Sequence, residues 1–221
     1  MNLQRRVRLV VVTGGSSAPS RSKILGEAIA SRIQSCLATE RADVEIGPLV
    51  PEFGAVQQRK DVTARAERAL RQIERAEMLV VVTPVYKGSY TGHFKHLFDL
   101  VDAGALVDVP VALAATGGGE RHALMVEHQL RPLFGFFRAQ TLPTAVYASE
   151  AEFEGLAVRS QALLARIEAV AAEAVSLARF AAAIHGGSSD SVHIHELGAP
   201  TQARLPTMPS TPCIGGASMT V

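Results

Sequence analysis

The chain of 221 residues carries 22 Lys and Arg against 21 Asp and Glu, and 48% of its residues are hydrophobic. This composition predicts one folded domain of ordinary size with a substantial core, and it excludes global disorder. The net charge of +1 and the absence of Trp argue against a nucleic-acid-binding surface, which needs basic patches and stacking rings.

The cysteines and the apolar runs indicate the cellular compartment in which the protein is expected. Cys36 and Cys213 are the only two cysteines, too few for a disulfide scaffold or a four-ligand zinc site. No apolar run approaches the about 20 residues that span a bilayer, and the run at 9–12 is too short for a secretion signal. We therefore expect a reduced, cytoplasmic protein that contacts no membrane.

Strand and helix patterns alternate along the chain. A run rich in β-branched residues predicts a strand at 7–13, and further runs predict strands at 44–50, 78–83, 109–116 and 141–148, of which 44–50 is the weakest. Apolar residues at helical spacing predict helices at 22–38, 63–76, 93–101, 121–137 and 160–184. Pro132 is expected to bend or interrupt the helix that contains it.

Five strand–helix repeats joined by short connections predict a doubly wound parallel sheet covered by helices on both faces. The turn at 14–19, G-G-S-S-A-P, lacks the G-x-G-x-x-G of the dinucleotide-binding fold. We therefore predict a flavodoxin-like five-stranded sheet of order 2-1-3-4-5 within residues 1–185. Residues 186–221 are rich in Gly, Ser, Thr and Pro, which predicts a flexible tail whose His193 and His195 complete no metal site.

Three loops follow predicted strands at the edge of the sheet where ligands bind in open α/β folds. The first, at 13–22, offers hydroxyls, Arg21 and the free N–H groups of a helix start, a combination that favours a phosphate. Helix capping by Ser20 or Ser22 is the structural alternative. The loop is no nucleotide P-loop, because it lacks the Lys-Ser/Thr ending.

The second and third loops suit a flat ligand. The loop at 83–92 carries Tyr86, Tyr90 and two glycines, so a planar group could lie against it. The loop at 115–121 contains three consecutive glycines, which permit main-chain donors to face a ligand. A flexible turn is the alternative for either loop alone.

Five stretches carry a family resemblance: G-G-S-S-A-P-S-R-S from Gly14, T-P-V-Y-K-G-S-Y from Thr83, H-L-F-D-L-V-D from His96, A-A-T-G-G-G-E-R-H-A-L from Ala114 and E-H-Q-L-R-P-L-F from Glu127. On them the chain resembles the NAD(P)H-dependent FMN reductases of two-component flavin monooxygenase systems, especially those of alkanesulfonate and methanesulfonate oxidation. The resemblance covers about residues 7–152 and leaves the tail unmatched.

The resemblance implies FMN and either NADH or NADPH, with hydride transfer from nicotinamide C4 to FMN N5 and no catalytic side chain. The implied binding residues are Ser16, Ser20, Arg21 and Ser22 for the phosphate, Pro84, Val85, Tyr86 and Gly88 for the ring, and Thr116, Gly117 and Gly118 on its other side. It also implies a homodimer or homotetramer. His128 falls where an interface helix of the family carries a π-type insertion, or is a surface histidine.

The same resemblance implies that reduced FMN leaves for a separate sulfonate monooxygenase. Three alternatives stay open at this point: a quinone or azo-compound reductase, a flavodoxin-like electron carrier, and a non-catalytic assembly protein. Carriers of that type are usually strongly acidic, whereas this chain is nearly neutral. The sequence does not separate NADH from NADPH as the hydride donor.

Overall fold

Apolar, β-branched runs build the centre of a parallel sheet. The computed structural model describes residues 6–15 and 19–186 of the chain. Its central strands are β1 (Val7–Thr13), β3 (Met78–Pro84) and β4 (Pro110–Gly117). Residues 78–83 are all buried, as expected for a strand covered by helices on both faces. The three clearest strand predictions are therefore confirmed to within one residue at each end.

The remaining strands of the sheet flank this centre. β2 (Thr39–Glu45) pairs with β1, while β5 (Gln140–Thr141) and β6 (Val146–Ser149) both pair with β4. All pairs are parallel, and the order is β2-β1-β3-β4-β5. The predicted flavodoxin-like order 2-1-3-4-5 is confirmed, and the carboxyl ends of β1, β3, β4 and β6 meet at one edge.

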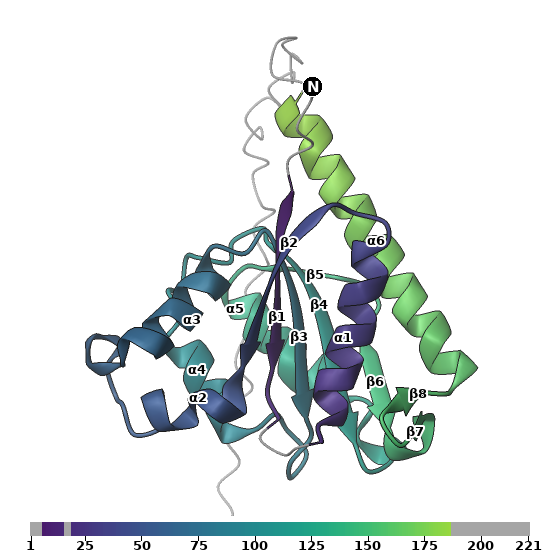
Figure 1. Ribbon diagram of the computed structural model, residues 1–221, viewed down its shortest axis with the longest axis horizontal. Coiled ribbons are helices and arrows are strands. Elements are labelled where there is room, and N and C mark those ends of the chain that lie inside the picture. The colour runs from purple at the N-terminus through teal and green to yellow at the C-terminus, as the bar shows by residue number, and fades with distance from the viewer. Residues whose placement is uncertain (1–5, 16–18, 187–221) are drawn as a thin grey trace, which may run out of the picture. The chain divides into compact units, whose positions relative to one another are not determined.

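Helices cover both faces of this sheet (Figure 1). One face carries α1 (Arg21–Gln34) and α6 (Gln161–Gly186), and the other carries α2 (Ile46–Phe53), α3 (Ala64–Glu74), α4 (Gly92–Asp99) and α5 (Arg131–Phe136), with a 3-10 turn η1 (Arg59–Asp61) before α3. Alternate side chains of β1 point to opposite faces of the sheet: Val10 and Val12 pack toward α2–α5, and Leu9 and Val11 pack toward α1 and α6.

The predicted strand at 44–50 is wrong. The strand lies earlier, at β2, and the helix α2 follows it directly. β2 is an edge strand that keeps most of its residues only partly buried, so it tolerates the polar sequence T-E-R-A-D-V-E. Ile46 and Leu49, two of the apolar residues that suggested a strand, instead recur at helical spacing with Phe53, and all three are buried against the core.

The predicted last strand, 141–148, is split in two. Residues 142–145 leave the sheet between β5 and β6 because Pro143 cannot donate to a ladder. Arg131 bridges the break: its guanidinium donates to the carbonyls of Leu142 at 2.9 Å and Pro143 at 3.2 Å. One side chain thus satisfies main-chain acceptors that lost their strand partners.

The predicted helix at 121–137 consists of three segments. A 3-10 turn η2 (Glu120–His122) precedes a π-helical turn η3 (Val126–Leu130), and α5 completes it. Pro132 lies in the first turn of α5, where its missing N–H removes the least hydrogen bonding. The predicted interruption at Pro132 is wrong, because the helix changes from π to α just before this residue and continues through it. The helical part begins several residues later than predicted.

A short hairpin between β6 and α6 was not predicted. After a 3-10 turn η4 (Glu150–Glu152), strands β7 (Phe153–Glu154) and β8 (Ala157–Val158) pair antiparallel. Gly155 closes the hairpin with a φ of 57°, which a glycine adopts without strain. Two-residue strands leave too little periodicity for a sequence to reveal them.

Candidate functional site

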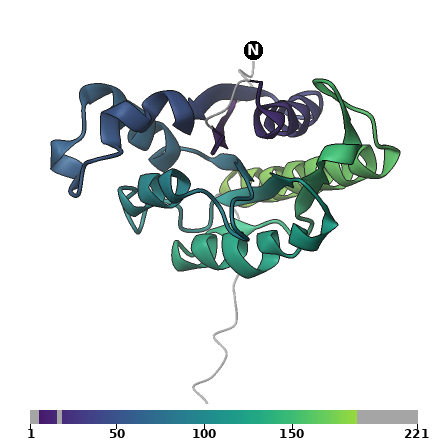
Figure 2. The ribbon, with the colours of Figure 1, turned by 90° about the horizontal axis from the view of Figure 1, so that it is seen from below.

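A cavity of about 340 Å³ lies at the carboxyl edge of the sheet. Figure 2 looks onto this edge from below. The lining residues come from the loops after β1, β3, β4 and β6: Gly15, Pro19, Ser20, Arg21, Ser22, Pro84, Val85, Tyr86, Thr116, Gly117, Gly118, Glu150, Gly155 and Leu156. The three loops singled out in the sequence therefore meet around one space. Of the predicted site residues, Gly88 does not line it and Ser16 lies outside the described residues.

The first loop presents the start of α1 to the cavity. Ser20 is the N-cap residue, and its hydroxyl accepts the N–H of Lys23 at 3.2 Å. The N–H groups of Arg21 and Ser22 occupy the first two helical positions, which have no acceptor within the helix. The Ser20 hydroxyl therefore caps the helix, as the structural alternative expects. The main-chain N–H groups of Arg21 and Ser22 and the partial positive charge of the helix start are still available to bind an anion.

Ser22 joins α1 to the third loop. Its side chain is buried, with 2% of the residue exposed, and its hydroxyl lies 2.7 Å from the hydroxyl of Thr116. Thr116, near the end of β4, is also buried, with 6% of the residue exposed. The shared hydrogen bond fixes the helix start against the strand end, so Ser22 shapes the cavity wall whether or not it also contacts a ligand.

The second loop turns tightly after β3. Tyr86 and Ser89 exchange two main-chain hydrogen bonds, at 2.9 and 3.2 Å. Lys87 and Gly88 between them have φ values of 54° and 84°, the two positive angles of a type I′ turn. Gly88 therefore serves the turn itself. The turn leaves Tyr86 52% exposed at the cavity, an uncovered ring against which a planar ligand can stack.

The third loop is held by Tyr147 of β6. The Tyr147 hydroxyl donates to the carbonyl of Gly119 at 2.6 Å, and burial raises the pKa of the phenol, which keeps the donor protonated. A Cβ on Gly117 would lie 2.4 Å from that hydroxyl, so only glycine fits there without moving the ring. A Cβ on Gly118 would meet nothing within 4 Å, so there is open space at this position of the cavity lining.

Sequence reasoning missed the residues that complete the cavity after β6. Gly155 and Leu156 come from the β7–β8 hairpin, and Glu150 comes from η4. The Glu150 carboxylate pairs with the Arg21 guanidinium. A signal was present: Ser149 and Glu152 form the S-x-x-E pattern of a capping box directly after a predicted strand, which places Glu150 at the ligand edge.

The cavity combines a helix start, one guanidinium, an exposed ring and glycine main chain. These groups suit a ligand with an anionic end and a flat body. Within the described residues no group of three or more His, Cys, Asp or Glu side chains is placed to hold a metal ion. In the same part of the chain, no helix has both the length and the apolar character needed to cross a membrane.

A flavodoxin-like sheet whose carboxyl edge carries such a cavity defines an α/β protein that binds its ligand beyond the carboxyl ends of the strands. The family model described as NADPH-dependent FMN reductase matches residues 7–153, and the chain belongs to this family. Its activity is that of an oxidoreductase which reduces FMN with a nicotinamide nucleotide.

Named relatives and solved structures resemble the chain over most of their length. It is 50% identical to the NADH-dependent FMN reductase SfnE of Pseudomonas putida, over 77% of this chain and 92% of that protein. It is 46% identical to an FMN reductase (NADPH) of Pseudomonas aeruginosa, over 77% and 91%. The X-ray structure of an oxidoreductase from Corynebacterium diphtheriae superposes with a TM-score of 0.72 at 32% identity, covering 78% of this chain and 96% of that one.

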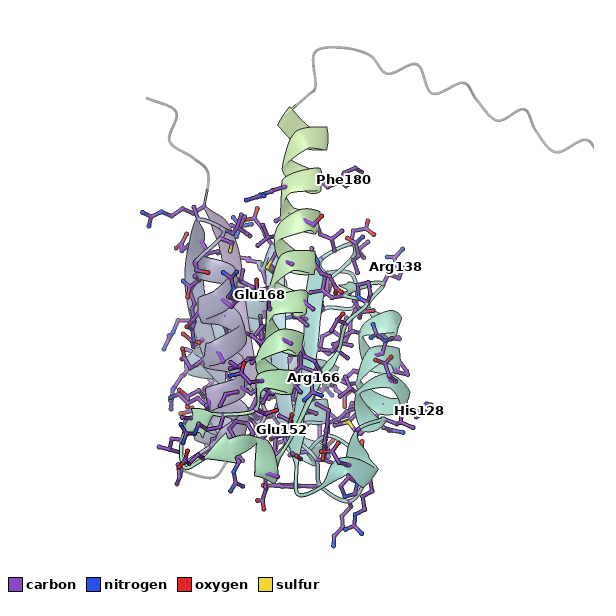
Figure 3. All side chains as sticks on the ribbon, turned by 90° about the vertical axis from the view of Figure 1, so that its right-hand side faces the viewer. His128, Arg138, Glu152, Arg166, Glu168 and Phe180 are labelled. Carbon is purple, nitrogen blue, oxygen red and sulfur yellow. The ribbon has the colours of Figure 1, made fainter. Side chains whose placement is uncertain are left out.

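His128 lies within the π-helical turn η3 and is exposed; it is labelled at the outer side of the molecule in Figure 3. The Arg131 N–H donates to the carbonyl of Val126, five residues earlier, which widens the turn. A role of His128 at an interface stays a prediction. The predicted tail and its histidines lie outside the described residues.

Proposed function

We propose that the cavity holds FMN with its phosphate at the start of α1 and its ring between the second and third loops. The donor set fits this ligand, since Arg21 and the first N–H groups of α1 can meet a phosphate. The exposed Tyr86 ring and the open space at Gly118 suit the flat isoalloxazine. A volume of about 340 Å³ falls within the usual range for small-molecule sites.

The lining residues bind and orient rather than transfer protons. FMN, when bound, supplies the hydride acceptor, and the nicotinamide nucleotide supplies the hydride. Gly117 and Gly118 line the region assigned to the ring, where main-chain N–H dipoles can stabilise added negative charge. The convergence of three separate loops on one cavity is the observation that carries this assignment.

Loss of the Arg21 guanidinium tests the phosphate assignment. We expect Arg21→Ala to weaken FMN binding roughly tenfold, the scale of one charge-assisted hydrogen bond, and to raise the FMN KM more than it lowers kcat. Arg65→Ala is a matched control, because Arg65 occupies the first turn of α3 and its guanidinium lies away from the cavity. Titration of FMN with each nucleotide measures both, and an unchanged KM in Arg21→Ala would refute the assignment.

We further propose that the reduced FMN passes to a separate flavin-dependent monooxygenase of sulfonate oxidation. The relative named SfnE and the motif resemblance support this role. Turnover of a sulfonate by such a monooxygenase should depend on this chain, a nicotinamide nucleotide and FMN together. A rate with quinone or azo acceptors that greatly exceeds the rate with free FMN would favour the alternative reductase.

We infer that the chain forms a homodimer or homotetramer in the cytoplasm through the segment at 120–136. Two large apolar side chains of this segment are uncovered, Leu124 at 64% and Phe136 at 69% exposed. Exposed apolar side chains of this size close to an irregular helix favour an interface. Sedimentation analysis of the full chain tests the oligomeric state.

A further inference from the structure

Two charged side chains stand out among the described residues that line the cavity: Arg21 and Glu150. They pair with each other across 129 positions of the sequence. Both are partly open to solvent, with 44% and 57% of their side chains exposed. The guanidinium assigned to the phosphate is therefore already occupied by a carboxylate at the same cavity.

The turn that carries Glu150 is built firmly. Glu152 accepts the main-chain N–H of Ser149 at 3.0 Å, and the two residues form a capping box around η4. The other carboxylate oxygen of Glu152 accepts a hydrogen bond from Arg166 of α6 at 2.5 Å, and Figure 3 shows these two side chains together near the start of α6. The turn that carries Glu150 is thus anchored to both β6 and α6, which places Glu150 in the lining of the cavity.

We propose that Glu150 is an affinity-setting residue that competes with the FMN phosphate for Arg21. This inference rests on the proposed function, because it takes Arg21 as the partner of the phosphate. When the phosphate arrives, the guanidinium must leave the carboxylate or share its charge with it, and the carboxylate then faces a dianion. When the phosphate departs, Glu150 pairs with Arg21 again, so the empty site keeps no unpaired cation.

The competition acts only on a phosphorylated flavin. Riboflavin has the same ring but no phosphate, so Glu150 leaves its affinity unchanged. Weakened retention of FMN suits a protein that hands its reduced product to another enzyme. Exposed ion pairs shift equilibria by about two- to fivefold, which sets the expected scale of the effect.

The test compares dissociation constants of FMN and riboflavin, measured by flavin fluorescence for the full-length wild type and variants. Glu150→Gln should lower the FMN constant about two- to fivefold and leave the riboflavin constant unchanged. The gain should shrink when Arg21→Ala is also present, because the competition for the guanidinium is then gone and only the repulsion between the carboxylate and the phosphate remains. Glu154→Gln is the matched control: Glu154 lies four residues away, pairs with Arg159 and does not line the cavity.

The outcomes separate the two ideas. If Arg21→Ala leaves the ratio of FMN to riboflavin affinity unchanged, the phosphate assignment itself is wrong. If that ratio falls but Glu150→Gln changes neither flavin, or changes both equally, the phosphate assignment stands and the competition is refuted. Glu150→Ala, which lacks the amide, provides a second variant with the same expected direction should the Gln side chain form a new contact.

Discussion

Replacing Ser22 by Ala should destabilise the fold. The substitution leaves the buried hydroxyl of Thr116 without its partner at 2.7 Å. An unsatisfied buried hydroxyl costs about 1–3 kcal/mol. For a domain of this size each kcal/mol corresponds to a change in Tm of about 2–4 °C.

The double variant provides the decisive comparison. Ser22→Ala with Thr116→Val removes both hydroxyls, so no polar atom is stranded, and we expect it to recover about 1 kcal/mol relative to the sum of the single variants. Urea unfolding of the four proteins gives the coupling free energy. Strict additivity would show that the two hydroxyls do not interact, and a large loss of FMN affinity in Ser22→Ala would show that Ser22 contacts the phosphate directly.

Three further outcomes follow from the packing and charges. Gly117→Ala should lower both FMN affinity and the free energy of unfolding, because its Cβ meets the Tyr147 hydroxyl at 2.4 Å. Adding Tyr147→Phe to the same chain should restore part of both. Equal stability of Gly117→Ala and wild type in thermal unfolding would contradict this clash. The hydrogen bond from Arg59 lowers the pKa of Glu67, so the ion pair stabilises the fold above the carboxyl's ordinary pKa, and this contribution is lost as pH falls through the lowered pKa. Glu67→Gln should therefore lose less stability than wild type between neutral and acid pH, as measured by urea unfolding. Parallel curves of stability against pH for the two proteins would argue against this role of the pair. Phe136→Asp should reduce the oligomer to a smaller species in sedimentation, whereas an unchanged mass would remove this side chain from the interface.

The elements that the sequence predicted well carry their signal locally. The runs of β1, β3 and β4 are apolar because helices cover both faces, so a few adjacent residues suffice to reveal them. β2 carries no such run, because an edge strand is only partly covered. The apolar residues after it were assigned to a strand although their spacing is helical.

The candidate site, like the fold, has one part that the sequence predicts and one part that it does not. Loops after parallel strands must meet at one edge, so the positions of Arg21, Tyr86 and Gly118 around a common cavity could be predicted from the order of elements. The contacts among these loops could not. Ser22 meets Thr116 over 94 positions of sequence, and no local pattern marks either hydroxyl as the partner of the other.

The chain's residue pattern alone determined an α/β protein with a flavodoxin-like sheet and a glycine- and serine-rich ligand edge, since hydrophobic period, turn chemistry and helix starts are properties of neighbouring residues. Only the tertiary structure decided that Glu150 occupies the guanidinium of Arg21, and that Tyr147 leaves room for nothing larger than glycine at position 117. Such pairings depend on how strands and helices pack in three dimensions, and packing is set by the whole chain at once.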